Sequence, residues 1–127
     1  FRRVLFRSKV DMWMCRDTLF HFPFKYLQQT LRNFVNSDIK YLLTSSHPGW
    51  YGGHHRFDRS YLIQNQPISA FGDFINLNLF KHPFNFPEPV DSMDDTCYDV
   101  GPLQREMVMF TRDQIANSYF LSAYVPD

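Results

Sequence analysis

Three neighbouring segments near the start of the chain alternate between short apolar runs and a longer amphipathic run. Residues 10–15 (VDMWMC) form a mostly apolar run of the kind found in buried parallel strands. Residues 39–46 (IKYLLTSS) form a second such run, rich in residues that fit a sheet. Between them, apolar side chains recur at helical spacing, at Phe24, Leu27, Leu31, Phe34 and Val35. The pattern predicts a strand, a helix of about 13 residues and a second strand.

Local signals place the ends of these elements. Pro23 suits the first turn of a helix, where its missing N–H would be unpaired anyway. Residues 36–38 (NSD) end the helix, and residues 47–49 (HPG) stop the second strand, because proline cannot continue a ladder. A strand, a helix and a strand in this order form a βαβ unit with two parallel strands and a right-handed crossover. The predicted fold class is therefore α/β.

The rest of the chain has a weaker pattern. Met107 to Phe110 is an apolar strand candidate, and Thr111 can cap a short helix that follows it. Ser118 to Val125 is read as a last strand or a tail. The segments without clear periodicity are a loop at 50–66, a weakly alternating stretch at 74–80, a proline-rich stretch at 83–89 and an acidic, turn-like stretch at 91–102.

Polar residues follow the first predicted strand at the point where an open α/β sheet binds its ligands, outside the carboxyl ends of its strands. Arg16 and Asp17 can hold charged amino and carboxylate groups of a cofactor, or can simply pair with each other and cap the next helix. His21 can act as a general base, because imidazole titrates near neutral pH, or can be structural. The structural alternatives stay open for all three residues.

Other combinations of polar residues carry weaker signals. His47, His54, His55 and Cys97 match no zinc-site spacing, and no metal is expected. Ser45, Ser46 and His47 lack the G-x-S-x-G elbow of a serine hydrolase. Residues 80–87 (FKHPFNFP) form either irregular packing at the sheet edge or a rigid aromatic wall at the mouth of a site.

The first eight residues, FRRVLFRS, are what the string TTCAGACGTGTGCTCTTCCGATCT encodes, and this string resembles a widely used sequencing adapter. Residues 1–8 are therefore interpreted as non-native and residues 9–127 as the native part. Without Arg2, Arg3 and Arg7, 10 of the 13 basic residues remain against 13 acidic ones. Such a mildly acidic chain has no electrostatic footprint for nucleic acid or for an anionic membrane.

Two further properties limit the class of protein. No apolar stretch approaches the ~20 residues that span a bilayer. Cys15 and Cys97 have no C-x-x-C spacing, so a disulfide framework is not expected and the predicted location is the cytoplasm. The sequence does not indicate an oligomeric state.

Several of these segments, taken in order, resemble class I S-adenosylmethionine-dependent methyltransferases. The first strand with Arg16 and Asp17, the stretch FHFP at 20–23, the helix and the strand YLLTSS at 41–46 resemble the fourth strand, the following helix and the fifth strand of that family. In a bacterial subset, later stretches are similar to INL at 75–77, PFNFPEP at 83–89 and MVMFTRDQI at 107–115. The likeness covers most of residues 10–115. At residues 71–74 (FGDF) the chain departs from the regular members, which puts substrate contacts there in doubt.

The resemblance implies strands four to seven of a Rossmann-like, seven-stranded, mostly parallel sheet with an antiparallel last strand. It implies S-adenosyl-L-methionine as cofactor and a small-molecule methyl acceptor as substrate. The residues that it implies are Cys15, Arg16 and Asp17 toward the cofactor, His21 and His47 as candidate bases, and Ser46, Asn76, Phe84, Asn85 and Phe86 toward the acceptor.

The resemblance also implies that the glycine-rich turn and the acidic residue that carry most cofactor binding lie upstream of this chain. We therefore expect the 127-residue chain alone to bind the cofactor weakly and to show no turnover. The alternative function is a non-enzymatic interaction module that uses the aromatic, proline-rich stretch as its surface. Convergence of Arg16, Asp17, Ser46 and His47 on one sheet edge favours the enzyme, whereas scattering of these residues with an exposed patch of the phenylalanines favours the module.

Overall fold

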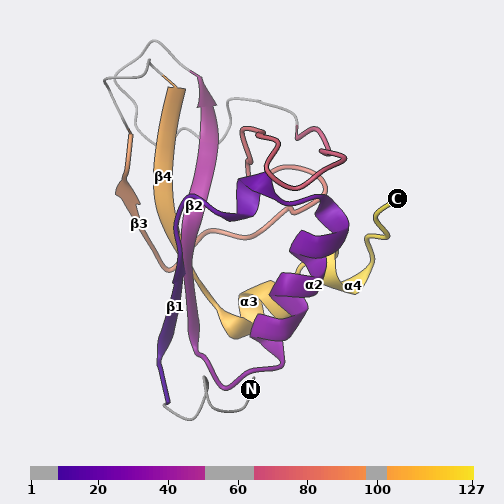
Figure 1. The fold of residues 1–127 in the computed structure, drawn as a ribbon. Helices are drawn as coiled ribbons and strands as arrows, with labels where there is room; N and C mark the ends of the chain where they lie inside the picture. Colours follow the sequence, from indigo (N-terminus) through magenta and orange to yellow (C-terminus); the bar gives the residue numbers. More distant parts are fainter. Residues whose placement is uncertain (1–8, 51–64, 97–102) are drawn as a thin grey trace.

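The sheet of this protein carries its helices against one face. The computed structural model describes residues 9–50, 65–96 and 103–127. In these ranges a four-stranded mixed sheet has the strand order β1-β2-β4-β3 (Figure 1). The helices lie together on one side of it, and the irregular segment at 65–90 passes over the same side.

The predicted βαβ unit is confirmed. Strand β1 (Met12–Cys15) pairs in parallel with β2 (Tyr41–Trp50), so that Trp13 lies opposite Leu42 and Met14 opposite Leu43. Helix α2 (Phe24–Val35) connects the two strands and buries its apolar stripe. Pro23 occupies the N-cap position, one residue before the predicted first turn. The carboxyl ends of β1 and β2 therefore meet at one edge of the sheet.

Strand β2 is longer than its sequence suggests. The prediction ended it before residues 47–49, yet the strand continues to Trp50. Its pairing with the neighbouring strand is irregular between Ser46 and Gly49. A bulge of this kind tolerates proline, because the proline then sits outside the regular ladder.

The other two strands are antiparallel to their neighbours. Strand β4 (Leu103–Thr111) lies between β2 and β3 (Asp91–Asp94) and runs antiparallel to both. Strands β1, β2 and β3 therefore share one direction, and the last strand opposes them. The turn-like prediction for residues 91–102 was wrong at 91–94, because the polar segment DSMD is held at the sheet edge by its pairing with β4 and not by local preference.

The chain ends in two short helices. Helix α3 (Arg112–Ala116) has the predicted Thr111 cap: Thr111 Oγ1 accepts from Gln114 N–H at 3.1 Å, and Gln114 Oε1 accepts from Thr111 N–H at 2.9 Å. Helix α4 (Tyr119–Ser122) replaces the strand that was one prediction for residues 118–125. Ser118 caps this helix, because its side chain accepts a hydrogen bond from Leu121 N–H. The helix ends at Ser122, and residues 123–127 follow it as a tail.

The hydrophobic core lies between the sheet and the helical layer. Leu42, Val108 and Phe110 on the sheet pack with Leu27 and Leu31 of α2, and all five are fully buried. The aromatic stretch at 80–87 belongs to this core. Phe84 is fully buried against the rings of Phe24 and Phe120, at 5.3 and 4.5 Å between centroids, and Phe86 is buried 5.2 Å from Phe110.

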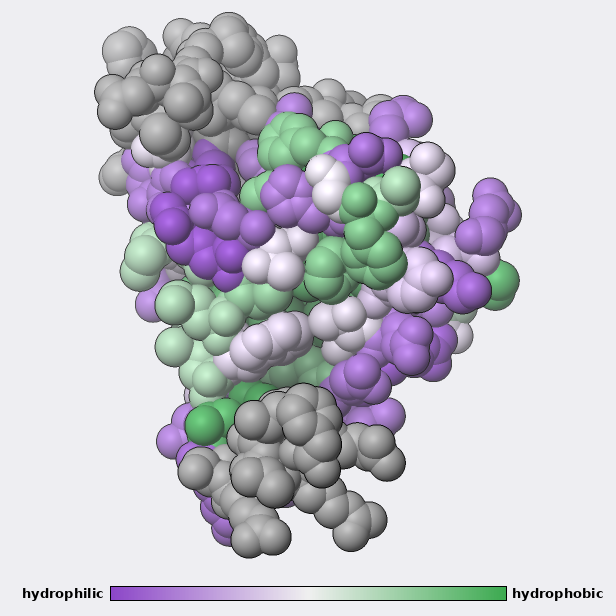
Figure 2. Space-filling view, viewed as in Figure 1, coloured by the Kyte–Doolittle hydropathy of each residue, from purple (hydrophilic) through white to green (hydrophobic). Residues whose placement is uncertain are grey.

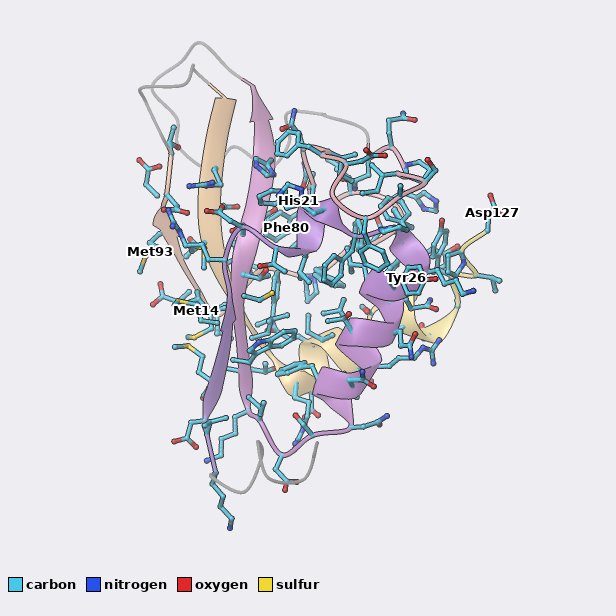
Figure 3. All side chains as sticks on the ribbon, viewed as in Figure 1. Met14, His21, Tyr26, Phe80, Met93 and Asp127 are labelled. Atoms are coloured by element: carbon cyan, nitrogen blue, oxygen red, sulfur yellow. The ribbon has the colours of Figure 1, made fainter. Side chains whose placement is uncertain are left out.

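The opposite sheet face is apolar but partly open. Successive residues of a strand point to opposite faces, so the register places one set on the face away from α2, namely Met12, Met14, Leu43, Met93, Met107 and Met109. Met14 is 60% exposed and Met93 59% exposed. Both side chains point away from the helices (Figure 3), and apolar side chains reach the surface along the strands (Figure 2). We refer to this set as the methionine face.

No helix in the described residues is long and apolar enough to cross a membrane.

Candidate functional site

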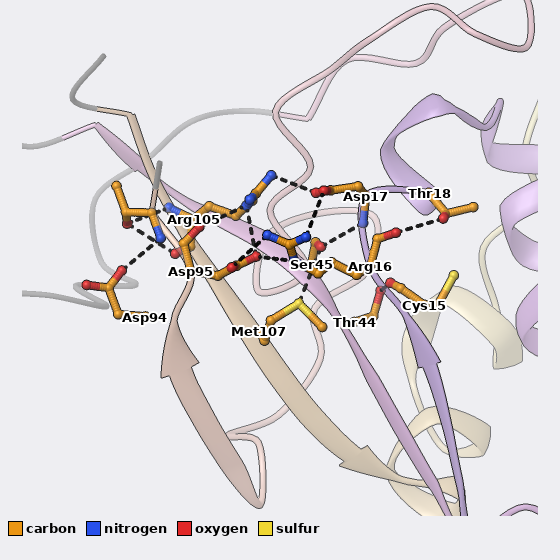
Figure 4. Close-up of polar contacts among 11 residues, drawn as sticks. Cys15, Arg16, Asp17, Thr18, Thr44, Ser45, Asp94, Asp95, Arg105 and Met107 are labelled. Carbon is orange, nitrogen blue, oxygen red and sulfur yellow. Dashed lines mark hydrogen bonds and ion pairs between the residues drawn. The ribbon is translucent and has the colours of Figure 1, made fainter. Parts of the chain in front are cut away.

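Four charged side chains gather at the edge of the sheet where the parallel strands end. Arg16 and Asp17 follow β1, Asp95 follows β3, and Arg105 lies on β4, which enters the sheet at this same edge (Figure 4). The strand directions bring them together, since β1 and β3 end at the edge of the sheet where the antiparallel β4 begins. We call these residues the charged quartet.

The quartet is a continuous network of ion pairs. Arg16 donates two hydrogen bonds of 3.0 Å to the two carboxylate oxygens of Asp95, in a bidentate arrangement. Arg105 donates from Nη1 to Asp17 Oδ1 at 2.6 Å, and its Nε lies 3.1 Å from Asp95 Oδ2. Arg16 also lies 3.5 Å from Asp17 Oδ2. Each carboxylate therefore contacts both guanidinium groups, and the two positive and two negative charges balance.

Asp17 adopts a backbone conformation that is uncommon for its residue type. Its φ angle is 56°, in the left-handed region where aspartate is tolerated better than most residues. Its N–H donates to Ser45 Oγ at 3.1 Å, and its carboxylate is held by the two arginines. Ser45 is buried on the neighbouring strand β2. Contacts from two other strands thus stabilise the conformation of Asp17, and such residues cluster at functional sites.

Ser46 and His47, in the second half of β2, are buried and turn toward the segment at 77–79. Ser46 Oγ accepts from Leu79 N–H at 3.2 Å, and His47 Nδ1 accepts from Leu77 N–H at 3.1 Å. The His47 N–H in turn donates to the Leu77 carbonyl at 2.7 Å. These two predicted site residues therefore anchor the segment that follows the loop, and they do not join the charged quartet.

The environment of His47 holds its imidazole neutral. Its side chain is 4% exposed and contacts the ring of Phe20, with centroids 5.2 Å apart. Burial, and secondarily the positive charge of Arg105, lower the pKa of His47 to about 4. The negative charge of Asp17 opposes this shift without overcoming it.

His21 lies in the short helix η1 (Leu19–His21), between β1 and α2 (Figure 3). Its Nδ1 lies 3.0 Å from the carbonyl oxygen of Asp73. Its ring is partly exposed and lies 4.6 Å from that of Phe20 and 6.0 Å from that of Phe74, between centroids. His21 thus lies beside an aromatic cluster.

Asn76 carries an unsatisfied polar atom. Its side-chain Oδ1 is buried and accepts no hydrogen bond from the described part of the chain. The residues on either side are fixed, since Ile75 N–H donates to the Phe20 carbonyl and Leu77 N–H donates to His47. A buried acceptor without a donor costs about 1–3 kcal/mol, so the position of Asn76 calls for a reason beyond folding.

The remaining predicted residues are distributed between core and surface. Cys15 is buried on the core face of β1, and burial raises the pKa of its thiol. Phe84 and Phe86 fill the core as described above, so their rings do not face an open site. Asn85 is exposed in a turn with a φ angle of 51°. Among the described residues, no cluster of His, Cys, Asp and Glu could hold a metal ion; His54, His55 and Cys97 lie outside them.

Sequence reasoning missed two members of the quartet. Asp95 is 79 residues from Arg16, and Arg105 is 88 residues from Asp17. Asp95 was assigned to a turn, and Arg105 was given no role. The only available signal was the predicted strand at 107–110. An antiparallel position of this strand beside β2, had it been predicted, would have placed Arg105 at the sheet edge that carries Arg16 and Asp17.

Comparisons of this chain with protein-family models, curated proteins and solved structures gave no match.

Proposed function

We propose that this chain is part of an S-adenosylmethionine-dependent methyltransferase that methylates a small molecule. The observation that carries the proposal is the charged quartet at the carboxyl edge of two parallel strands, the location at which open α/β sheets bind ligands. Arg16 and Asp17, the residues for which the sequence resemblance implied a cofactor role, are both members of it.

The strand directions add support. The resemblance implied a mostly parallel sheet whose last strand is antiparallel. Among the described strands, β1, β2 and β3 run in one direction and only β4, the last, opposes them. This arrangement is a coarse feature shared by other α/β proteins, so it supports the proposal without singling out a methyltransferase.

The residues at the edge fit the charged end of the cofactor. The methionine part of S-adenosylmethionine carries an ammonium and a carboxylate group, and the quartet offers partners of both signs in Asp17 and Arg16. Arg16 is about half exposed and Asp17 is 41% exposed, so both are accessible. When bound, the cofactor supplies a methyl group that is already activated by its sulfonium charge. The protein's own task is then to orient two reactants and to exclude water.

One further residue has a property suited to the acceptor: His21 is partly exposed next to aromatic rings. Asn76, which the resemblance also implied to face the acceptor, has a side-chain oxygen that is buried and accepts no hydrogen bond from a described residue. The alternative of an interaction module built on the aromatic stretch receives less support, because Phe84 and Phe86 are buried.

The proposal is tested by titrating the ¹⁵N-labelled chain with S-adenosylmethionine at millimolar concentration and recording amide NMR spectra. We expect weak binding with shifts confined to the Arg16, Asp17 and Ser45 amides and their neighbours. The variant Asp17→Asn should weaken the response, whereas the exposed Asp38→Asn should not. Shifts scattered over the surface, or no shifts at all, would contradict the proposal.

A further inference from the structure

The hydrogen bonds of His21 and His47, the two histidines near the sheet edge, indicate different tautomers of their neutral rings. His21 and His47 both contact the rings of Phe20 and Phe74. The hydrogen bond that one imidazole nitrogen makes determines which nitrogen carries the proton in the neutral ring. The partner of His21 Nδ1 is a hydrogen-bond acceptor, whereas the partner of His47 Nδ1 is a donor. This difference decides which nitrogen of each neutral ring keeps a lone pair.

His21 has a basic Nε2. Its Nδ1 lies 3.0 Å from the Asp73 carbonyl oxygen, and a carbonyl can only accept. Nδ1 must therefore carry the hydrogen, which leaves the lone pair of the neutral ring on Nε2. No described residue hydrogen-bonds to that Nε2. The same Asp73 carbonyl fixes the ring orientation, as a backbone carbonyl does in many histidine bases.

His47 has the reverse arrangement. Its Nδ1 accepts from the Leu77 N–H, so Nδ1 carries the lone pair and Nε2 carries the hydrogen. The lone pair is thus already engaged by the backbone, in a side chain that is 4% exposed. Of the two candidate bases that the sequence suggested, this geometry favours His21.

The surface around His21 is aromatic. Phe74 is 55% exposed, and its ring lies 6.0 Å from that of His21 and 5.2 Å from that of Phe20. Phe71 is 56% exposed and packs on Phe22 and Tyr26 at 5.3 and 4.6 Å. Aromatic rings that pair edge to face or offset are stabilised by about 0.5–1.5 kcal/mol beyond the area they bury. A flat aromatic ligand is therefore the class of molecule that this surface fits.

We propose that the methyl acceptor is an aromatic hydroxyl compound that packs against Phe74, and that Nε2 of His21 takes its proton. The inference rests on the proposed methyltransferase function. The hydroxyl oxygen forms its bond to the methyl carbon as its O–H bond breaks, and the proton passes to Nε2. The electron pair of the broken carbon–sulfur bond stays on the sulfur of the departing thioether. His21 is thereby the catalytic residue, and the Asp73 carbonyl positions it.

The first test reads the tautomers directly, without cofactor or turnover. In imidazole ¹⁵N NMR spectra of the ¹⁵N-labelled chain at pH 8, we expect the hydrogen of His21 on Nδ1 and the hydrogen of His47 on Nε2. The variants His21→Gln and His47→Gln assign the signals. A hydrogen on Nε2 of His21 would overturn the proposal, whatever the cofactor titration shows.

The second test uses para-fluorophenol as probe and para-fluorotoluene, which lacks the hydroxyl, as its matched control. Fluorine NMR should show the phenol binding roughly tenfold more tightly than the toluene, the worth of about one hydrogen bond. His21→Gln should remove that difference, and Phe74→Ala should weaken both probes. His82→Gln, at an exposed histidine, should change neither.

Equal binding of the two probes, or a preference that survives His21→Gln, would overturn the proposal. The cofactor titration is read separately, so failure of the acceptor site and failure of the methyltransferase proposal give different results.

Discussion

Arg105 donates a hydrogen bond of 2.6 Å to Asp17 across 88 residues of sequence. This contact joins the last strand of the sheet to the loop after the first, and it is the centre of the charged quartet. It also explains why Asp17 holds a left-handed backbone conformation, because the carboxylate is fixed from β4 while the N–H is fixed from β2. The candidate site thus depends on the whole sheet and not on one loop.

Removing Arg105 should destabilise the protein. The side chains of Arg105 and Asp95 are 18% and 20% exposed, so Arg105→Gln leaves partly buried carboxylates with weaker compensation. We expect a loss of about 1–3 kcal/mol in the free energy of unfolding, measured by urea denaturation. The matched control is Lys40→Gln, whose ion pair with Asp11 is long, at 3.9 Å, and exposed. That variant should cost less than about 0.5 kcal/mol, and equal losses in the two variants would contradict the structural role given to Arg105.

Stability should fall in acid because of His47. The unfolded chain takes up this proton near pH 6.5, whereas burial lowers the pKa of the folded state to about 4. Between these values the unfolded state binds more protons, so the contribution is present above pH 6.5 and is lost as the pH falls to 4. The full loss is on the order of 3 kcal/mol.

The measurement is the free energy of unfolding in urea at several pH values. His47→Asn should flatten this part of the curve, because an asparagine oxygen can still accept from Leu77 N–H but does not titrate. His82→Asn controls for the loss of one imidazole. An unchanged slope in His47→Asn would assign the acid sensitivity to other groups.

Two phenylalanines with different surroundings should respond differently to truncation. Phe84 is fully buried among aromatic rings, so Phe84→Ala should cost about 3–5 kcal/mol through lost burial and a cavity. Phe71 is 56% exposed, and Phe71→Ala should cost about 1 kcal/mol or less. Thermal unfolding of both variants checks this. A small effect at Phe84 would mean that the aromatic stretch is a surface feature after all, as the interaction-module hypothesis requires.

Asn76→Leu should leave stability unchanged or raise it by about 1 kcal/mol. The substitution removes a buried oxygen that accepts no hydrogen bond from the described residues and replaces it with an apolar side chain of similar size. The comparison variant is Asn78→Leu: Asn78 is fully buried and its Oδ1 accepts from Phe80 N–H, so its loss should destabilise. Strong destabilisation by Asn76→Leu would indicate a purely structural role for Asn76.

The methionine face should bind hydrophobic dyes. Met14 and Met93 are the most exposed of its residues, and replacing both with lysine should lower the fluorescence of bound ANS without unfolding the protein. Val125→Lys is the control, because Val125 is exposed but lies alone in the tail. Unchanged dye binding in the double variant would show that the dye reports another surface.

The elements that were predicted from sequence are those that local pattern determines. Helix α2 and strand β1 follow from apolar spacing and from Pro23, and the Thr111 cap follows from residues only three positions apart. Strand β3 was missed because DSMD lacks strand character, and only its pairing with β4 makes it a strand. In the site, Arg16 and Asp17 could be proposed from their place after β1. Their partners Asp95 and Arg105 could not, since chain topology alone brings them near.

The order of strands also dictates when the sheet can be finished. Strand β3 pairs with β4 and with no other described strand, and β4 is the last of the described strands in sequence order. During synthesis, residues 91–94 leave the ribosome before residues 103–111, the strand with which they pair. Strands β3 and β4 therefore complete the described sheet only when β4 pairs with β2, and pairing between strands so far apart in the sequence is a slow kind of assembly step.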